Sequence, residues 1–220
     1  MGSDACIMPI YQSHDGVETR DNSIDEPTNP DGTWKVLLHG GYGNPFDFRL
    51  TSDIHTLFPN SYIFSLSAAV NDNRLWDADN TQKDLDHLES LINALMALYG
   101  LNYSNGALIG ISNGGMMALR LVNRLNFSKV VSVSGTYNAP EDFTYTGKVL
   151  LINSIRDKII PYAGNASNNS IADSLTAIGQ TATVQNEALL GVKLGSFYHS
   201  WDEIKELTDL NNKIEVFLNA

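Results

Sequence analysis

Three residues that could act together in nucleophilic catalysis occur in this order along the chain: Ser112, Asp157 and His199. Ser112 is the central residue of "GISNG", residues 110–114, which fits the pattern G-x-S-x-G. A serine hydroxyl is nearly unreactive alone, so it needs a base to take its proton and an acid to orient that base. The sequence therefore predicts Ser112 as nucleophile, His199 as base and Asp157 as acid.

The segments on either side of Ser112 support a special role for this residue. An apolar run, "GALIGI", ends directly before it, and a helical pattern, "NGGMMALRLV", starts directly after it. A strand that turns so abruptly into a helix forces its central residue into a strained backbone conformation, and only residues without Cβ can lie close beside it. The simpler interpretation is that glycine and serine merely form a turn, but the position between strand and helix favours catalysis.

His199 lies in the loop before the last helical pattern, with Ser200 as the expected N-cap and Glu203 completing a capping box. Such a helix start would fix the loop that carries the imidazole. The other histidines lie in a polar arm, a glycine-rich loop and two helical patterns: His14, His39, His55 and His87. His199 is therefore the candidate base.

The acid has two candidates, because an aspartate follows each of two apolar runs. Asp157 stands shortly after "KVLLINS", with Pro161 closing the turn, and Asp142 comes after "KVVSVSG". Both satisfy the order serine, aspartate, histidine. Asp157 is the preferred acid, and Asp142 is the alternative.

A glycine-rich loop, "LLHGGYGNP" at residues 37–45, could bind the negative charge that develops on the substrate oxygen. Loops of this kind can turn backbone N–H groups toward an oxyanion. One donor is expected to be the N–H of Asn113, the residue after the nucleophile, and the other the N–H of Gly41 or Tyr42. His39 is expected to pack beneath the loop.

Composition excludes several classes of function. The chain has 220 residues, 43% of them hydrophobic, a formal net charge of -11 and a single cysteine, Cys6. The negative charge disfavours nucleic acid and anionic membranes as partners, and one cysteine excludes an intrachain disulfide or a cysteine-built metal site. We expect one soluble domain that uses no metal and no cofactor. The N-terminus shows no signal peptide, and the compartment and the oligomeric state stay open.

The elements that would position these residues alternate along the chain after a polar arm at residues 1–33, which is compatible with an early hairpin. Residues 34–220 then form one domain. Expected strands cover residues 34–40, 62–67, 106–112, 129–135, 148–154 and 182–190, and expected helices cover 47–58, 81–100, 113–125, 170–180 and 200–218. Because the strands are near-continuous aliphatic runs separated by helices, the fold class is α/β, a mostly parallel sheet with helices on both faces.

The chain resembles the α/β-hydrolase superfamily over roughly residues 34 to 218, through "LLHGGYGNP", "GISNGGMMALRL", "RDKIIPYAG" and "YHSW". The resemblance is to esterases of the polyhydroxybutyrate-depolymerase-like and feruloyl-esterase-like branch, and more loosely to the phospholipase/carboxylesterase family. It implies the same roles for Ser112, Asp157 and His199. It also implies a carboxylic-ester hydrolase that works through an acyl-enzyme.

The expected substrate is a small-molecule ester with a short acyl or aryl group. Segment 136–147 is too short for a large cap domain, and segment 68–82 is too polar to sheathe a fatty chain. Aromatic residues near the site could line a substrate pocket or simply pack: Tyr42, Phe46, Trp76 and Trp201. The alternatives are a peptidase or acyltransferase with the same triad, and a binding protein that kept the fold without the chemistry.

Overall fold

The computed structural model describes residues 13–14, 17–18, 22–41, 43–67, 76, 82–137, 143–160, 171–189, 199–207 and 209–220. Its centre is a seven-stranded sheet in the order β3-β5-β4-β6-β7-β8-β9. The strands are β3 (Ser23–Asp25), β4 (Trp34–Leu38), β5 (Tyr62–Leu66), β6 (Gly106–Ile111), β7 (Lys129–Val133), β8 (Lys148–Ser154) and β9 (Thr183–Leu189). Strand β3 runs antiparallel to β5, and the other pairings are parallel.

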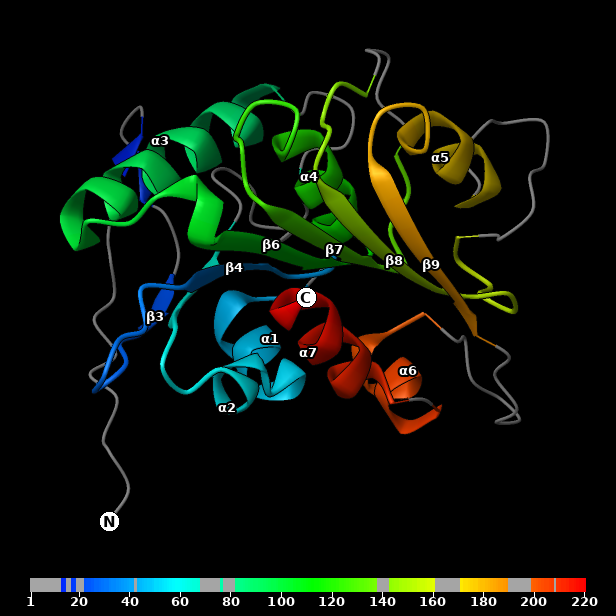
Figure 1. Cartoon of the computed structure of the whole chain (residues 1–220), viewed down its shortest axis with the longest axis horizontal. Coiled ribbons are helices and arrows are strands. Elements are labelled where there is room, and N and C mark those ends of the chain that lie inside the picture. Colours follow the sequence, from blue (N-terminus) through cyan, green and yellow to red (C-terminus); the bar gives the residue numbers. More distant parts are fainter. Residues whose placement is uncertain are drawn as a thin grey trace.

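Helices cover both faces of this sheet (Figure 1). One face carries α3 (Gln82–Tyr99), α4 (Asn113–Leu121) and α5 (Ile171–Ile178). The other carries α1 (Pro45–Ser52), α2 (Ile54–Leu57), α6 (Trp201–Leu207) and α7 (Leu210–Asn219). A short 3-10 helix, η1 (Tyr103–Asn105), precedes β6. The predicted α/β class, with a mostly parallel sheet between helices, is confirmed.

Each face of the sheet has its own apolar core. Successive side chains of a strand point to opposite faces, so in β4 Val36 and Leu38 join the core under α3 and α4, while Leu37 joins the core under α1 and α7. All three are fully buried. Burial on both faces explains why these strands are continuous aliphatic runs rather than alternating ones.

The sheet begins earlier than the predicted boundary at residue 34. Strand β3 lies within the expected polar arm, and Ile24 in its centre is buried. Asp25 is also buried because its carboxylate forms a bidentate ion pair with Arg49 of α1. Nearer the N-terminus, β1 (Ser13–His14) and β2 (Val17–Glu18) pair antiparallel, where the early hairpin was expected.

Two helices expected to be continuous are each divided. The helix expected at 47–58 is α1 and α2, separated by Asp53, whose φ of 56° is left-handed. Aspartate tolerates this conformation better than most residues. Helix α1 also starts earlier than expected, at Pro45, because the Asn44 side chain accepts a hydrogen bond of 2.8 Å from the backbone N–H of Asp47. The helix expected at 200–218 is α6 and α7.

Within the described ranges, no helix combines the length and the apolar character that crossing a membrane requires.

Candidate active site

Ser112 occupies the turn between β6 and α4, and its backbone conformation is one that residues with a side chain rarely adopt. Its φ is 53° and its ψ is -120°, outside the helical and extended regions. Its N–H donates to Val133 O at 2.7 Å, and its carbonyl accepts from Met116 N at 3.0 Å. The neighbouring strand β7 and the first turn of α4 therefore hold the residue in the strained conformation that the sequence pattern predicts.

The neighbouring glycines are required because backbone fills the space where their side chains would be. A Cβ on Gly110 would overlap the carbonyl group of Gly114, and a Cβ on Gly114 would overlap the carbonyl oxygens of Leu38 and His39. The motif thus brings β6, α4 and the end of β4 into direct contact. Small residues here are a packing requirement as well as a turn preference.

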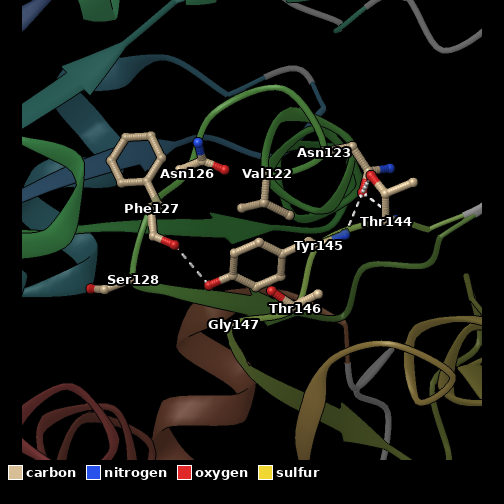
Figure 2. Close-up of a pocket in the computed structure, with 9 residues that line it drawn as sticks. All are labelled: Val122, Asn123, Asn126, Phe127, Ser128, Thr144, Tyr145, Thr146 and Gly147. Atoms are coloured by element: carbon tan, nitrogen blue, oxygen red, sulfur yellow. Dashed lines mark hydrogen bonds between the residues drawn. The ribbon is translucent and has the colours of Figure 1, made fainter.

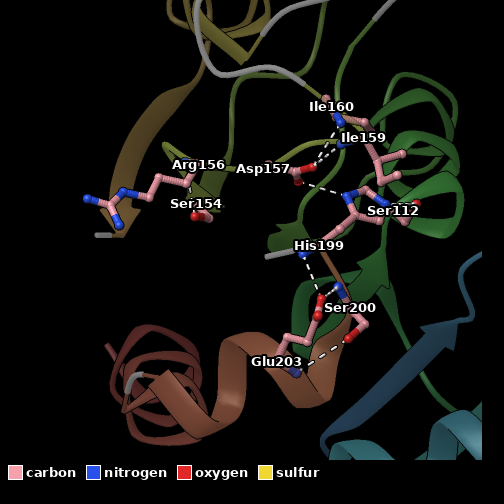
Figure 3. A network of polar contacts seen from close by, with 9 residues as sticks. All are labelled: Ser112, Ser154, Arg156, Asp157, Ile159, Ile160, His199, Ser200 and Glu203. Carbon is pink, nitrogen blue, oxygen red and sulfur yellow. Dashed lines mark hydrogen bonds and ion pairs between the residues drawn. The ribbon is translucent and has the colours of Figure 1, made fainter. Parts of the chain in front are cut away.

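Ser112, His199 and Asp157 form one line of hydrogen bonds (Figure 3). Ser112 Oγ lies 2.6 Å from His199 Nε2, and His199 Nδ1 lies 2.7 Å from Asp157 Oδ2. A carboxylate only accepts, so Nδ1 carries the hydrogen and Nε2 is left free to accept from the serine hydroxyl. The His199 side chain is 14% exposed and that of Asp157 is 2% exposed. The three sequence-predicted residues are therefore brought together.

The loop after β8 wraps around the Asp157 carboxylate. Its Oδ1 accepts from the backbone N–H groups of Ile159 at 2.8 Å and Ile160 at 2.9 Å. The Asp157 N–H donates to Ser154 O at 3.1 Å. These bonds leave Oδ2 for His199 and fix its direction, because a carboxylate with two backbone donors on one oxygen has little freedom to rotate.

The capping box predicted at the start of α6 holds the backbone of His199. Glu203 Oε2 accepts from the N–H of His199 at 3.1 Å and from that of Ser200 at 3.2 Å. In return, the Glu203 N–H donates to Ser200 Oγ at 3.4 Å. The imidazole therefore projects from a fixed helix start (Figure 3).

The glycine-rich loop after β4 lies against the serine. A Cβ on Gly40 would lie 3.6 Å from the Cβ of Ser112, which is ordinary contact distance. Within the loop, His39 Nδ1 donates to Gly40 O at 2.7 Å, and Gly43 N donates to the same oxygen at 3.1 Å. His39 is 2% exposed, as expected of a packing residue. Gly41 is described, whereas Tyr42 lies outside the described residues.

Of the aromatic residues considered for a substrate pocket, the two tryptophans are buried. Trp76 is 1% exposed and Trp201 is 3% exposed. Trp201 packs edge-on against Phe48 of α1, with ring centroids 5.2 Å apart. Both rings are thus buried, and a role for them in substrate binding stays a prediction. Phe46 lies in α1, but its side chain is not described. Tyr42 and the alternative acid Asp142 lie outside the described residues.

Trp76 makes two contacts that sequence reasoning missed. Its indole Nε1 donates to His39 O at 2.7 Å, and its backbone N–H donates to the side-chain oxygen of Asn113 at 2.8 Å. Both partners lie 37 residues away in the chain. Local periodicity contains no signal for contacts of this separation.

No metal or second ligand site emerges from the described part of the chain. Among those residues, no group of three or more His, Cys, Asp or Glu side chains could hold a metal ion. A cavity of about 240 Å³ lies at the opposite edge of the sheet, between the end of α4 and the start of β8 (Figure 2). Two polar groups of its lining are already paired: half-buried Asn123 Oδ1 accepts from Thr144 N at 3.0 Å, and the buried Tyr145 hydroxyl donates to Phe127 O at 2.9 Å.

No protein-family model matches the sequence, and no curated protein matches it. Solved structures do resemble the chain. A Bacillus cereus carboxylesterase has a TM-score of 0.66 at 15% identity, over 90% of this chain and 93% of that one. Esterase PE8 has a TM-score of 0.67 at 20% identity, over 90% and 97%. YahD, solved with malic acid, has a TM-score of 0.67 at 19% identity, over 90% and 98%. At these identities the likeness concerns the fold, and the narrower resemblance to polyhydroxybutyrate depolymerases stays a prediction.

Proposed function

We propose that this chain, which has the α/β-hydrolase fold, is a serine hydrolase of small carboxylic esters. The observation that carries the proposal is the line of two hydrogen bonds, of 2.6 and 2.7 Å, from Ser112 through His199 to Asp157. Support also comes from the strained backbone of Ser112, because such strain is found where a nucleophile is held exposed at the edge of a sheet.

In the proposed reaction, Ser112 Oγ attacks the ester carbonyl carbon while its proton passes to His199 Nε2. Asp157 stabilises the imidazolium and keeps its Nδ1–H pointing away from the serine. Collapse of the tetrahedral intermediate breaks the bond to the alcohol oxygen, which takes the proton from Nε2. An acyl-enzyme and a free alcohol result.

The second half repeats these steps with water as the nucleophile. His199 takes a proton from water, the hydroxide adds to the acyl carbon, and the proton returns to Ser112 Oγ as the carboxylic acid leaves. The negative oxygen of each intermediate is assigned to the backbone N–H of Asn113 and to that of Gly41 or Tyr42. Support for Asn113 comes from its place as the first residue of α4, where N–H groups lack helical partners.

The test combines labelling with turnover. Wild type should react with a fluorophosphonate probe and hydrolyse p-nitrophenyl acetate, whereas Ser112→Ala should do neither while keeping its circular dichroism spectrum. Loss of a nucleophile typically costs about 10³-fold or more in rate. A Ser112→Ala variant that kept a large part of the activity would contradict the assignment.

A panel of substrates separates the alternatives. Faster turnover of matched amides than of esters would favour a peptidase, and product formation that depends on an added alcohol or amine would favour an acyltransferase. A wild-type protein that neither labels nor turns over any ester would indicate a binding protein with this fold.

A further inference from the structure

We propose that Trp76 is a positioning residue that ties the glycine-rich loop after β4 to the first residue of α4, and so holds together the two sources of the oxyanion-binding N–H groups. This inference rests on the proposed function. Trp76 was considered above as a substrate contact, but its contacts and its burial fit a different role.

The first contact fixes one peptide group of the loop. The indole N–H of Trp76 donates to His39 O at 2.7 Å, and Trp76 is 1% exposed, so water cannot easily replace it. A peptide group is planar and trans, so its C=O and N–H point in opposite directions. Holding the carbonyl of His39 therefore also sets the direction of the Gly40 N–H.

The ring of Trp76 reaches the next peptide group through the histidine. The indole lies beside the His39 imidazole, with ring centroids 4.9 Å apart and an interplanar angle of 30°. That imidazole donates from Nδ1 to Gly40 O at 2.7 Å. The same planarity then directs the N–H of Gly41, which is one of the two candidates for the second oxyanion donor.

The second contact reaches the other side of the anion site. The backbone N–H of Trp76 donates to Asn113 Oδ1 at 2.8 Å. Asn113 follows the nucleophile and supplies the first proposed oxyanion donor through its own backbone. One residue thus bonds to both segments that must converge on the substrate oxygen.

Gly114 of α4 also keeps the loop after β4 and the start of the helix close together. It lies so close to the carbonyl oxygens of Leu38 and His39 that a Cβ would overlap both. This contact sets how near the loop and α4 approach, while Trp76 sets where the loop carbonyl points. Together they would preorganise the donors before substrate binds, which is how oxyanion stabilisation gains its strength.

Trp76→Phe removes the indole N–H and keeps an aromatic ring. Because the oxyanion exists only after attack, we expect kcat to fall about 10-fold with KM nearly unchanged; this is less than the 10²–10³-fold loss typical of removing a direct donor. The affinity for a trifluoromethyl ketone, which forms an anionic tetrahedral adduct with serine, should fall by the same factor as kcat/KM.

The matched control is Trp34→Phe. Trp34 is 0% exposed and its indole N–H also donates to a backbone carbonyl, that of Asn102 at 2.8 Å, but at the start of β4 rather than beyond its end. Both variants lose the same kind of buried hydrogen bond, so both should lose stability. Only Trp76→Phe should lose kcat.

Asn113→Ala is a second variant that leaves the indole in place and removes the acceptor of the Trp76 backbone N–H. It should also lower kcat with little change in KM. Two results with an active wild type would overturn the inference alone. One is an equal kcat for Trp76→Phe and Trp34→Phe, and the other is an effect of Trp76→Phe on KM only. Absence of wild-type turnover would instead overturn the proposed function, and the inference with it.

Discussion

Asp157 lies 2.7 Å from His199 Nδ1 across 42 positions of chain, and the two carboxylate oxygens have different partners. Oδ2 faces the imidazole, while Oδ1 accepts from the backbone N–H groups of Ile159 and Ile160. The orientation of the histidine therefore depends on a loop that is organised around the carboxylate itself. An amide in place of the carboxylate would still accept from the two backbone N–H groups, but it would donate a hydrogen bond to the imidazole instead of accepting one.

Asp157→Asn should fold normally and lose activity. The amide oxygen can still accept from Ile159 and Ile160, but an amide NH₂ facing Nδ1 favours the tautomer whose Nε2 carries the hydrogen. That tautomer cannot take the proton of Ser112, so kcat should fall by about 10⁴. Steady-state kinetics on p-nitrophenyl acetate would measure the loss.

A suitable control for this prediction is Asp25→Asn, which changes another buried carboxylate, the partner of Arg49. It should lower the free energy of unfolding, because it leaves a buried guanidinium unpaired, with kcat nearly unchanged. Comparable kcat losses in the two variants would indicate that Asp157 acts only through stability.

Gly114→Ala should destabilise the protein by about 3 kcal/mol or more, because the new methyl group would meet backbone rather than a movable side chain. Gly100→Ala makes a useful contrast: its φ is +65° and its Cβ would have no atom within 4 Å. That change should cost only about 1 kcal/mol of backbone strain. Urea unfolding of both variants measures the difference, and equal costs would contradict the packing described for Gly114.

Lys35 should make stability depend on pH in alkaline solution. Lys35 is 5% exposed, and its amine donates to Thr33 Oγ1 at 3.0 Å and Ser61 Oγ at 2.9 Å and lies 4.5 Å from the centre of the Phe58 ring. Burial lowers the pKa of Lys35 from 10.5 to about 8, although Asp31 raises it somewhat. Between about pH 8 and pH 10.5 the unfolded chain binds more protons than the folded one. The contribution of Lys35 to the free energy of unfolding therefore increases with pH over this range.

The measurement compares wild type with Lys35→Met at pH 7 and at pH 10.5. The free energy of unfolding of wild type relative to the variant should increase by about 3 kcal/mol over this range, since each unit of pKa difference corresponds to about 1.4 kcal/mol. A difference that stayed constant with pH would show that the amine keeps its proton in the folded protein.

The predicted absence of a large cap leads to a preference for short acyl groups. Each methylene that reaches a buried site would add about 0.8 kcal/mol of binding, so an open site should stop gaining after a few carbons. We expect kcat/KM for p-nitrophenyl esters to peak near acetate or butyrate. A maximum at laurate or longer chains would contradict an open site.

Sequence patterns predicted the central strands β4 to β8 well because these strands are buried on both faces and leave long aliphatic runs. They predicted the capping box at Ser200 and Glu203 equally well, since its spacing is fixed by one helical turn. Strand β3 was missed because three residues cannot display a period, and because Asp25 is tolerated inside only through its distant partner Arg49.

The site was predictable to the extent that its residues belong to local motifs. Ser112 is marked by glycines whose spacing is set by steric contact, whereas Asp157 had a rival in Asp142 because any aspartate after a strand fits the order of the chain. Trp76 was recognised as aromatic and near the site. Its bonds to His39 and Asn113 depend on how separate segments meet, which no local pattern encodes.

The strained, positive-φ backbone of Ser112 has an evolutionary consequence. Such a conformation costs roughly 1–3 kcal/mol for a residue with a side chain, and much less for glycine. Selection for thermal stability therefore favours glycine at position 112, whereas selection for turnover favours serine. A mutant library sorted only by survival of heating should accumulate glycine there, whereas the same library sorted by growth on an ester should retain serine.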